Sequence, residues 1–388
     1  MNLSAKKILA ARVPDLRIDL LRGLANWSLL LDHIPHNVVN FITLRNFGFS
    51  GATDVFVFIA GYAAALSFGR MAMERGFVVT TTRMLRRTWQ LYVAYVVLFV
   101  IYIDIISNVA AQYATTEIID EYNVIGIVDH PIRTLMRGLM LQAKPLNLDT
   151  LQLFVAMMAM FPLVLWSMLR RPNLTLAGSV ALYAAARIFD WSVPSFPSGT
   201  WYFNPFSWQL LSVLGAWFAL NGSNLVRIAR RLPWLRIAAA VYLLFALAVT
   251  IGARVPALAG FVPDSGLDLF MPVEKENLAP YRVMHLLALG LLFTYFVPRD
   301  WPALRSGWLQ PLMKCGKEWL ASFCAGVFLS FAGHFVLITG PNSIAMQILV
   351  SVTGIALMTA IAYYISWSRR QDSKNPLGPE AQRINRTA

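Results

Sequence analysis

The sequence predicts an all-α integral membrane protein of about ten transmembrane helices, with both termini in the cytoplasm. The first observation is composition: of the 388 residues, 57% are hydrophobic and only 14% are charged, whereas soluble domains are about 25% charged. The second is a mean hydropathy of +0.56. The third is a series of apolar runs of about 20 residues, the length that a helix needs to cross a bilayer. These runs fill the chain, so residues 1–388 are expected to form a single multi-span domain.

Ten apolar runs follow one another along the chain. The predicted spans are residues 20–42, 50–69, 88–110, 150–169, 174–190, 206–221, 236–253, 281–297, 318–338 and 345–367. The first 17 residues are basic but lack the apolar core and small-residue cleavage site of a signal peptide, so residues 1–19 are expected to form an interfacial segment. Residues 369–388 are polar and are expected to form a disordered cytoplasmic tail.

Lysine and arginine determine the predicted orientation. The chain carries 33 of them, a formal net charge of +13 and a pI near 10.0. With the N-terminus inside, most of these cations fall on the cytoplasmic side, as the positive-inside rule requires. They lie in short loops between apolar spans, which argues for membrane lipids as partners and against nucleic acid. Cys315 and Cys324 fall in or beside a predicted span and indicate neither a disulfide framework nor a metal site.

The first predicted span carries Arg22 near its start and His33 eleven residues later. At about 1.5 Å per residue they lie roughly 16 Å apart along one face of a helix. Ionisable groups at membrane depth are costly and are therefore functional candidates. An imidazole can accept and return a proton near neutral pH, which makes His33 a candidate general base. A histidine that only hydrogen-bonds a neighbouring helix explains the residue equally well.

Two acids and a second histidine lie near His33 in the sequence. His36 and Asp32 give too few ligands for a metal, and no metal site is predicted. Asp32 points about 100° away from His33 on a helix. A short hinge, with Gly48 and Gly51, leads to Asp54 at the start of the second span, and Asp54 is the better candidate to interact with His33.

Arg83 and Arg86 precede the third span and share a helix face at i, i+3 spacing. Guanidinium groups suit bidentate phosphate binding, although a simple positive-inside anchor explains the pair as well. On the predicted outer side, residues 191–206 are rich in aromatic residues and proline. Such rings can stack on sugars, but a membrane-interface aromatic belt is the simpler interpretation.

These residues carry a resemblance to a known family. The R-x10-H pattern of Arg22 and His33 and the R-x-x-R pattern of Arg83 and Arg86 resemble the signature pair of the membrane-bound acyltransferase-3 superfamily. More closely, RIDLLRG, LDHIPHN, the TLRNFGFS run at 43–50 and DVFVFIAGY resemble the OpgC family of osmoregulated periplasmic glucan succinyltransferases. The resemblance continues through KENLAPYRVMH at 275–285 and the ten-span layout, and is most specific over residues 17–92.

The resemblance implies a bacterial inner-membrane enzyme that takes an acyl group from cytoplasmic succinyl-CoA or acetyl-CoA, as co-substrate, to a hydroxyl of a periplasmic glucan. It implies no permanently bound cofactor. It also assigns roles: His33 as the base, Arg22, Arg83 and Arg86 as ligands of acyl-CoA, and Asp19 as a substrate-binding residue that supports Arg22, while Asp54 lies where relatives commonly have an acid. Independently of the resemblance, Arg282 and His285 in the eighth span are candidate substrate-binding donors for an oxyanion, and Arg282 or Lys275 could bind a succinyl carboxylate. Ala60-Gly61 replaces the Ser-Gly of many relatives, which closes a route through an acylated serine there.

Two other function classes remain open at this stage. A transporter of glucan, lipid or organic anion would show an inverted repeat with broken helices, and no such symmetry is visible. A structural component of a polysaccharide assembly would not need Arg22 and His33 on one stripe. The acyl group, the acceptor glycan, the choice between direct transfer and an acyl-enzyme, and the oligomeric state are not fixed by the sequence.

Overall fold

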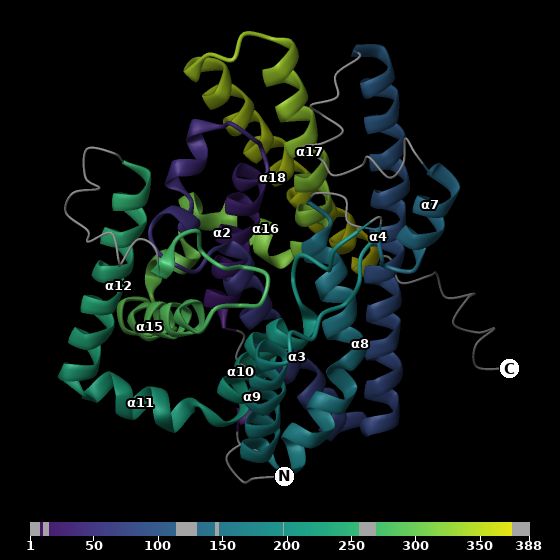
Figure 1. Cartoon of the computed structure of the whole chain (residues 1–388). Helices are drawn as coiled ribbons and strands as arrows, with labels where there is room; N and C mark the ends of the chain where they lie inside the picture. Colours follow the sequence, from purple (N-terminus) through teal and green to yellow (C-terminus); the bar gives the residue numbers. More distant parts are fainter. Residues whose placement is uncertain are drawn as a thin grey trace, which may run out of the picture. The chain divides into compact units, whose positions relative to one another are not determined.

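The computed structural model describes residues 8–10, 15–113, 130–143, 147–196, 198–255 and 269–374. Within these ranges the chain is helical and forms no strand; its only bridges are the isolated pairs Ala143–Phe196 and Pro194–Thr200. Of the long stretches between predicted spans, residues 114–129 and 256–268 lie outside the described residues. The predicted all-α class is therefore confirmed for the part of the chain that is described (Figure 1).

The chain forms two compact units. Unit 1 comprises Met1–Asp15 and Phe41–Arg299, and unit 2 comprises Leu16–Asn40 and Asp300–Ala388. The helices of unit 1 are η2 (Leu44–Asn46), α3 (Ala52–Arg75), α4 (Phe77–Tyr113), α7 (Pro131–Leu139), α8 (Asp149–Arg170), α9 (Pro172–Ile188), α10 (Pro205–Asn221), α11 (Ser223–Arg231), α12 (Pro233–Arg254) and α15 (Pro280–Phe296). Those of unit 2 are α2 (Leu16–Asp32), η3 (Pro302–Arg305), η4 (Gly307–Leu309), α16 (Gln310–Lys317), α17 (Trp319–Thr339) and α18 (Ile344–Lys374), and η1 (Val38–Ile42) crosses the boundary.

Each of the ten predicted spans contains a long helix, but fewer than ten of these helices qualify as spans. Six described helices are long and apolar enough to cross a membrane: those over Ala52–Arg75, Phe77–Ile105, Asp149–Arg170, Pro233–Arg254, Trp319–Thr339 and Ile344–Gln371. The other four, α2, α9, α10 and α15, have 17 residues each. At 1.5 Å per residue such a helix reaches about 26 Å, short of the roughly 30 Å hydrocarbon core.

The prediction of one continuous span over residues 20–42 is wrong. Helix α2 ends at Asp32, and the chain continues through a turn into η1. Pro35 explains the break, because a proline disfavours helical geometry in the residue before it and lacks an N–H for the helical ladder. His36 follows with a φ of 55°. At the other end, α18 continues to Lys374, so residues 369–374 of the predicted disordered tail are helical; residues 375–388 lie outside the described residues.

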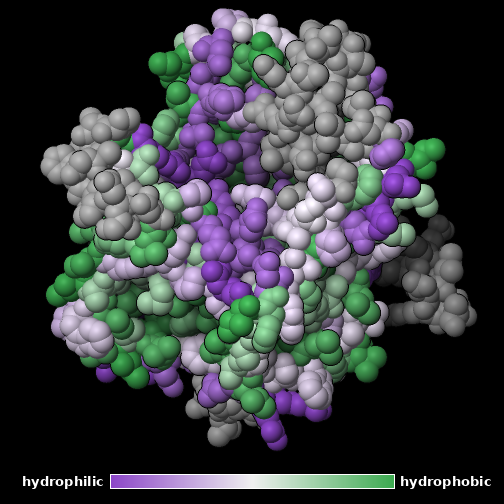
Figure 2. Space-filling model, viewed as in Figure 1, coloured by the Kyte–Doolittle hydropathy of each residue, from purple (hydrophilic) through white to green (hydrophobic). Residues whose placement is uncertain are grey.

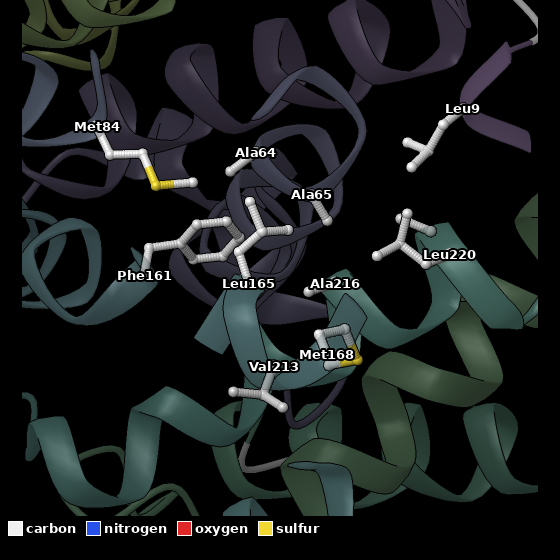
Figure 3. Packing of buried hydrophobic residues seen from close by; sticks show 11 residues of the cluster. Leu9, Ala64, Ala65, Met84, Phe161, Leu165, Met168, Val213, Ala216 and Leu220 are labelled. Atoms are coloured by element: carbon white, nitrogen blue, oxygen red, sulfur yellow. The ribbon is translucent and has the colours of Figure 1, made fainter. Parts of the chain in front are cut away.

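The core of unit 1 is built around α3. Side chains from α3, α4, α8 and α10 converge with Leu9 of the N-terminal segment (Figure 3). A Cβ on Gly61 would lie 2.0 Å from the Ser212 carbonyl oxygen, and one on Gly215 would lie 2.1 Å from the Phe58 carbonyl oxygen. Helices α3 and α10 therefore pack backbone to backbone, which fixes the position of the N-terminus of α3. The predicted interfacial segment contributes at least Leu9 to this protein core.

In the core of unit 2, the main chains of α2 and α16 also approach each other closely at glycine residues. A Cβ on Gly23 of α2 would lie 2.0 Å from the Leu312 carbonyl oxygen, and one on Gly316 of α16 would lie 1.8 Å from the Asp19 carbonyl oxygen. Leu30, together with Cys315 of α16 and two residues of α18, fills the adjoining apolar cluster. Helix α2 is thus held against α16 by main-chain contact on one side and by apolar packing on the other.

Large apolar side chains cover parts of the surface, as expected of a protein that faces lipid. On α12, Trp234, Ile237, Val241 and Leu244 are exposed at roughly helical spacing. Figure 2 shows apolar surface on the side of the view where Figure 1 places α12. The six candidate spans and this exposed apolar stripe together identify the chain as a membrane protein.

Candidate functional site

The candidate site in unit 1 starts at the N-terminus of α3. Gly51 is the N-cap residue, and its backbone N–H donates to Asp54 Oδ2 at 2.8 Å. An acid three residues after the cap commonly satisfies the cap N–H in this way, and its charge suits the positive end of the helix dipole. Asp54 is fully buried. The hinge recognised in the sequence therefore ends in a buried, charged helix cap.

Arg282 supplies the opposite charge. It lies in the first turn of α15, and its Nη2 donates to Asp54 Oδ2 at 2.5 Å, with both side chains at most 3% exposed. The guanidinium carbon also lies 6.0 Å from the ring centroid of Trp208. Burying either charge alone is costly, so each residue makes the burial of the other possible. The two predicted site residues Asp54 and Arg282, far apart in the sequence, are thus brought together.

His285 lies one helical turn after Arg282 and contacts the hinge. The Ser50 backbone N–H donates to His285 Nδ1 at 3.3 Å, and Ser50 Oγ lies 2.6 Å from the same nitrogen. Because a backbone N–H can only donate, Nδ1 is an acceptor, and a neutral imidazole then carries its proton on Nε2. A Cβ on Gly48 would lie 2.0 Å from that Nε2. Glycine is required at position 48 because the imidazole occupies the space of a side chain.

Each of these three residues retains a buried polar atom without a hydrogen-bond partner among the described residues. The atoms are Asp54 Oδ1, Arg282 Nε and His285 Nε2. Buried polar groups in folded proteins are nearly always satisfied, by protein or by ordered water. One acceptor and two donors left open within a single cluster therefore indicate a place for a polar ligand or water. We call these three residues, with Gly48 and Ser50, the Asp54–Arg282–His285 site.

An aromatic cluster packs against this site. Phe49, between the two hinge residues that contact His285, is buried and stacks on Phe270 with ring centroids 5.1 Å apart. Tyr281 meets the same ring edge-on at 5.0 Å, and the His285 ring lies 6.0 Å away. Such contacts add to the apolar burial of the rings. Phe49 therefore anchors the hinge between α12 and α15 and holds the imidazole in place.

The residues before α15, from Glu274 to Asn277, are hydrogen-bonded to α9 and to the start of α10. Arg187 of α9 pairs with Glu274 through two hydrogen bonds of 3.0 and 3.1 Å. The Trp208 indole N–H donates to the Lys275 carbonyl at 3.0 Å, and the Asn204 side chain donates to Asn277 Oδ1 at 2.8 Å. These bonds position the first turn of α15 and hence Arg282.

Tyr202 adds a neutral hydroxyl to this region. Burial raises the pKa of its phenol, the charge of Asp149 raises it further, and the charge of Arg282 opposes the rise. The phenol therefore stays protonated across the physiological range and can act as a hydrogen-bond donor.

The two predicted phosphate-binding arginines of unit 1 lie elsewhere. Arg83 and Arg86 are exposed on the first turns of α4. A single residue, Gly76, separates α3 from α4, and the two helices pack together. At 1.5 Å per residue, Gly76 lies about 33 Å along α3 from Asp54, whereas Arg83 lies only about 10 Å into α4. The two arginines share a face as predicted, at the opposite end of α3 from Asp54.

The remaining predicted site residues belong to unit 2. Asp19 and Arg22 lie on α2, and the Arg22 guanidinium lies 6.0 Å from the ring centroid of Trp319, the first residue of α17. His33 follows the last residue of α2, and its backbone N–H still donates to the Leu29 carbonyl at 3.1 Å. The imidazole is partly exposed. His33 therefore lies in the turn that closes α2 and not, as predicted, within a longer span.

Ser50 in the Asp54–Arg282–His285 site and Trp208 beside Arg282 are not identifiable as functional from the sequence. Ser50 is a short polar residue in a hinge, and Trp208 is one of 12 tryptophans in an apolar chain. Their partners lie far away in the sequence, and no local periodicity reports such contacts. The closely spaced glycines 48 and 51, and the TLRNFGFS run at 43–50 that resembles the family, were the available signals.

Comparison with protein families matches residues 14–370 to the family described as OpgC protein. The match covers nearly the whole chain, both units and every predicted site residue. No curated protein and no solved structure matches the chain.

Proposed function

From the premise that this chain belongs to the OpgC protein family, we propose that it is a membrane-bound acyltransferase that esterifies hydroxyls of a periplasmic glucan. We place it in the bacterial inner membrane, with both termini cytoplasmic and acyl-CoA as the donor. The R-x10-H and R-x-x-R patterns support membership of the acyltransferase-3 superfamily. Six helices long and apolar enough to cross a bilayer support the membrane setting.

The observation that carries the proposal is the buried Asp54–Arg282–His285 site. A structural scaffold gains little from burying an ion pair, since well-packed apolar residues often stabilise a fold as well or better. Three polar atoms left open in that cluster fit a protein that binds a polar substrate. A transporter could use such a site too, so the test below separates transfer from transport.

We assign the proton transfer to His33. The imidazole takes the proton of a glucan hydroxyl, the oxygen attacks the thioester carbonyl, and the carbon–sulfur bond breaks. The thiolate of CoA recovers the proton from His33, so the base is regenerated and no oxidant or metal is needed. Partial exposure in the turn after α2 suits a group that must meet two substrates. Arg22, Arg83 and Arg86 are proposed to bind the anionic donor.

We assign recognition of the acyl group to Arg282. A succinyl group differs from an acetyl group by a carboxylate, which needs a charge-assisted donor in an apolar setting. Arg282 Nη2 is used by Asp54, whereas Nε lacks a partner among the described residues. The open Nε–H supports succinyl as the preferred group. His285 Nε2–H supplies a second donor for the succinyl carboxylate.

The test combines cells and purified protein. Mass spectrometry of periplasmic glucans from cells with and without the protein should find ester-linked substituents only when it is present. Purified protein in nanodiscs should acylate glucan from succinyl-CoA. His33→Ala should lower the rate about 10²- to 10⁴-fold with an unchanged unfolding temperature, and His36→Ala is the matched control.

Three results would count against this proposal. Unesterified glucan in both strains would remove the transferase function. Full activity of His33→Ala would remove the assigned base. Movement of glucan or anion across proteoliposomes without CoA, and without ester formation, would replace the enzyme by a transporter.

A further inference from the structure

A cluster of cations in unit 2 lies next to the helix that carries Arg22. Lys314 and Lys317 share a face of α16, one turn apart. Arg369 and Arg370 lie near the end of α18. We call these four residues the α16–α18 cation cluster.

Lys314 and Arg370 both donate hydrogen bonds to Ser366 of α18. The Lys314 ammonium donates to Ser366 Oγ at 3.2 Å and lies 5.9 Å from the ring centroid of Tyr363. Arg370 Nε donates to the Ser366 carbonyl at 3.1 Å. Ser366 is buried, so both side chains are directed to a fixed point on α18. Their convergence is therefore a feature of the fold and not a chance meeting of mobile surface chains.

Around the Lys314 ammonium, the described positive charges act more strongly than the negative one. Burial lowers the pKa of the Lys314 ammonium, the neighbouring charges of Arg370 and Lys317 lower it further, and Glu318 opposes them. Glu318 is itself engaged, because Arg369 Nη1 lies 2.5 Å from its Oε2. Like charges held together raise the energy of a folded protein unless an anion is bound among them.

The cluster is continuous with the predicted donor-binding side of unit 2. Gly23 and Gly316 bring α2 and α16 into main-chain contact, and Trp319, next to Glu318, meets Arg22. Given the proposed use of acyl-CoA, we propose that the α16–α18 cation cluster binds the 3′-phosphate of that donor. A phosphate monoester carries between −1.5 and −2 charges at pH 7, which suits several converging cations better than the single charge of a lipid phosphodiester.

The experiment uses the full chain in nanodiscs of neutral lipid and two probes, CoA and dephospho-CoA, which lacks the 3′-phosphate. Calorimetry should show tighter binding of CoA to the wild type, by roughly tenfold or more, the scale of one hydrogen bond between charged groups. Lys314→Gln/Lys317→Gln should remove most of that preference while leaving the affinity for dephospho-CoA nearly unchanged.

The controls test charge and folding. Lys314→Arg/Lys317→Arg keeps the cations and should keep the preference. Arg227→Gln/Arg230→Gln removes two cations at the same spacing on the exposed helix α11 and should also keep it. Thermal unfolding of each variant confirms that the loss of binding is not a loss of structure.

The outcomes separate this inference from the proposed function. If the wild type binds CoA and the glutamine variant keeps the full preference over dephospho-CoA, the inference is overturned while the transferase proposal stands. If the wild type binds neither probe, both are overturned. If the glutamine variant loses only its response to added phosphatidylglycerol, the cluster is a lipid site and the inference is overturned.

Discussion

The Asp54–Arg282–His285 site and the α16–α18 cation cluster are both charged regions on helices of an apolar protein, but their solvation differs. The Asp54 and Arg282 side chains are at most 3% exposed and neutralise each other. In the cation cluster, the Arg369 side chain is 68% exposed, and the charges of Arg370 and Lys317 act on Lys314 more strongly than that of Glu318. Because Asp54 and Arg282 are buried, the stability of the first region depends on both of them being present. The charges of the second region are exposed and can interact with a ligand. Substitutions should therefore cost more stability in the first region than in the second.

Energetics explain why this difference should be measurable. Removing one partner of a buried ion pair leaves an uncompensated charge and typically costs 3–5 kcal/mol. Removing an exposed charge usually changes stability by about 0–1 kcal/mol. Substitutions in the Asp54–Arg282–His285 site should thus lower the free energy of unfolding, and substitutions in the α16–α18 cation cluster should mainly alter the proposed donor binding.

The largest effect is expected for Asp54→Ala. It removes the partner of Arg282 and the acceptor of the Gly51 N–H together, so the free energy of unfolding should fall by about 3–5 kcal/mol. The measurement is denaturant or thermal unfolding of the protein in detergent.

The control for Asp54→Ala is the apolar double variant Asp54→Leu/Arg282→Met. It removes both charges and should recover most of the lost stability, because no buried charge remains unpaired. Recovery of stability without recovery of succinyl transfer would separate the two roles of the pair. A single variant as stable as the wild type would contradict the buried pairing.

Gly48→Ala should have the next largest effect. Its Cβ would lie 2.0 Å from His285 Nε2, so the imidazole must move away from Ser50, at a cost of about 1–3 kcal/mol. The comparison is Gly178→Ala in α9, where a Cβ meets nothing within 4 Å; alanine there should leave stability equal or raise it by up to about 1 kcal/mol. Equal behaviour of the two variants would refute the close packing of His285 on the hinge.

Ser50→Ala should have a smaller effect. It removes the hydroxyl at 2.6 Å from His285 Nδ1 but keeps the backbone N–H at 3.3 Å. Loss of one such hydrogen bond costs about 0.5–1.5 kcal/mol. Nitrogen-15 NMR of the histidine ring should still show the proton on Nε2. A switch to the Nδ1–H tautomer would mean that the backbone bond does not determine the tautomer.

The smallest effect is expected for Trp319→Phe in unit 2. The ring stays apolar, but its attraction for the Arg22 guanidinium weakens, which is worth less than about 1 kcal/mol. Stability should be nearly unchanged, and the KM for acyl-CoA should rise no more than a few-fold. A loss of several kcal/mol would show that unit 2 depends on its charges as strongly as unit 1 does.

The helices could be predicted from the sequence because their signals are local. The span predicted at 236–253 corresponds to helix α12 (Pro233–Arg254), and the span predicted at 206–221 corresponds to helix α10 (Pro205–Asn221). The end of the first span was predicted ten residues too late, at residue 42 and not at Asp32, because Pro35 was not recognised as the helix break. Whether a run qualifies as a membrane span depends on the length of its helix. Small errors in the predicted helix ends therefore change the number of spans.

The partners within the site could not be predicted in the same way. Asp54 pairs with a residue 228 positions away, and Ser50 with one 235 positions away. Asp54 and Arg282 were both named as candidates, but their ion pair depends on how α3 and α15 pack. Such contacts follow from tertiary structure, which no spacing within one helix encodes. The roles of Arg83, Arg86 and His33 remain predictions.

The contact between Gly23 and Gly316 has a further consequence for how unit 2 can work. At Gly23 and Gly316 no side chain separates the main chains of α2 and α16, so the two helices cannot shift relative to each other by repacking side chains there. Any step that displaces Arg22 during turnover must carry Lys314 and Lys317 with it. The spacing between Arg22 and the two lysines is then fixed before any ligand arrives, so the donor site proposed above would select its ligand by length.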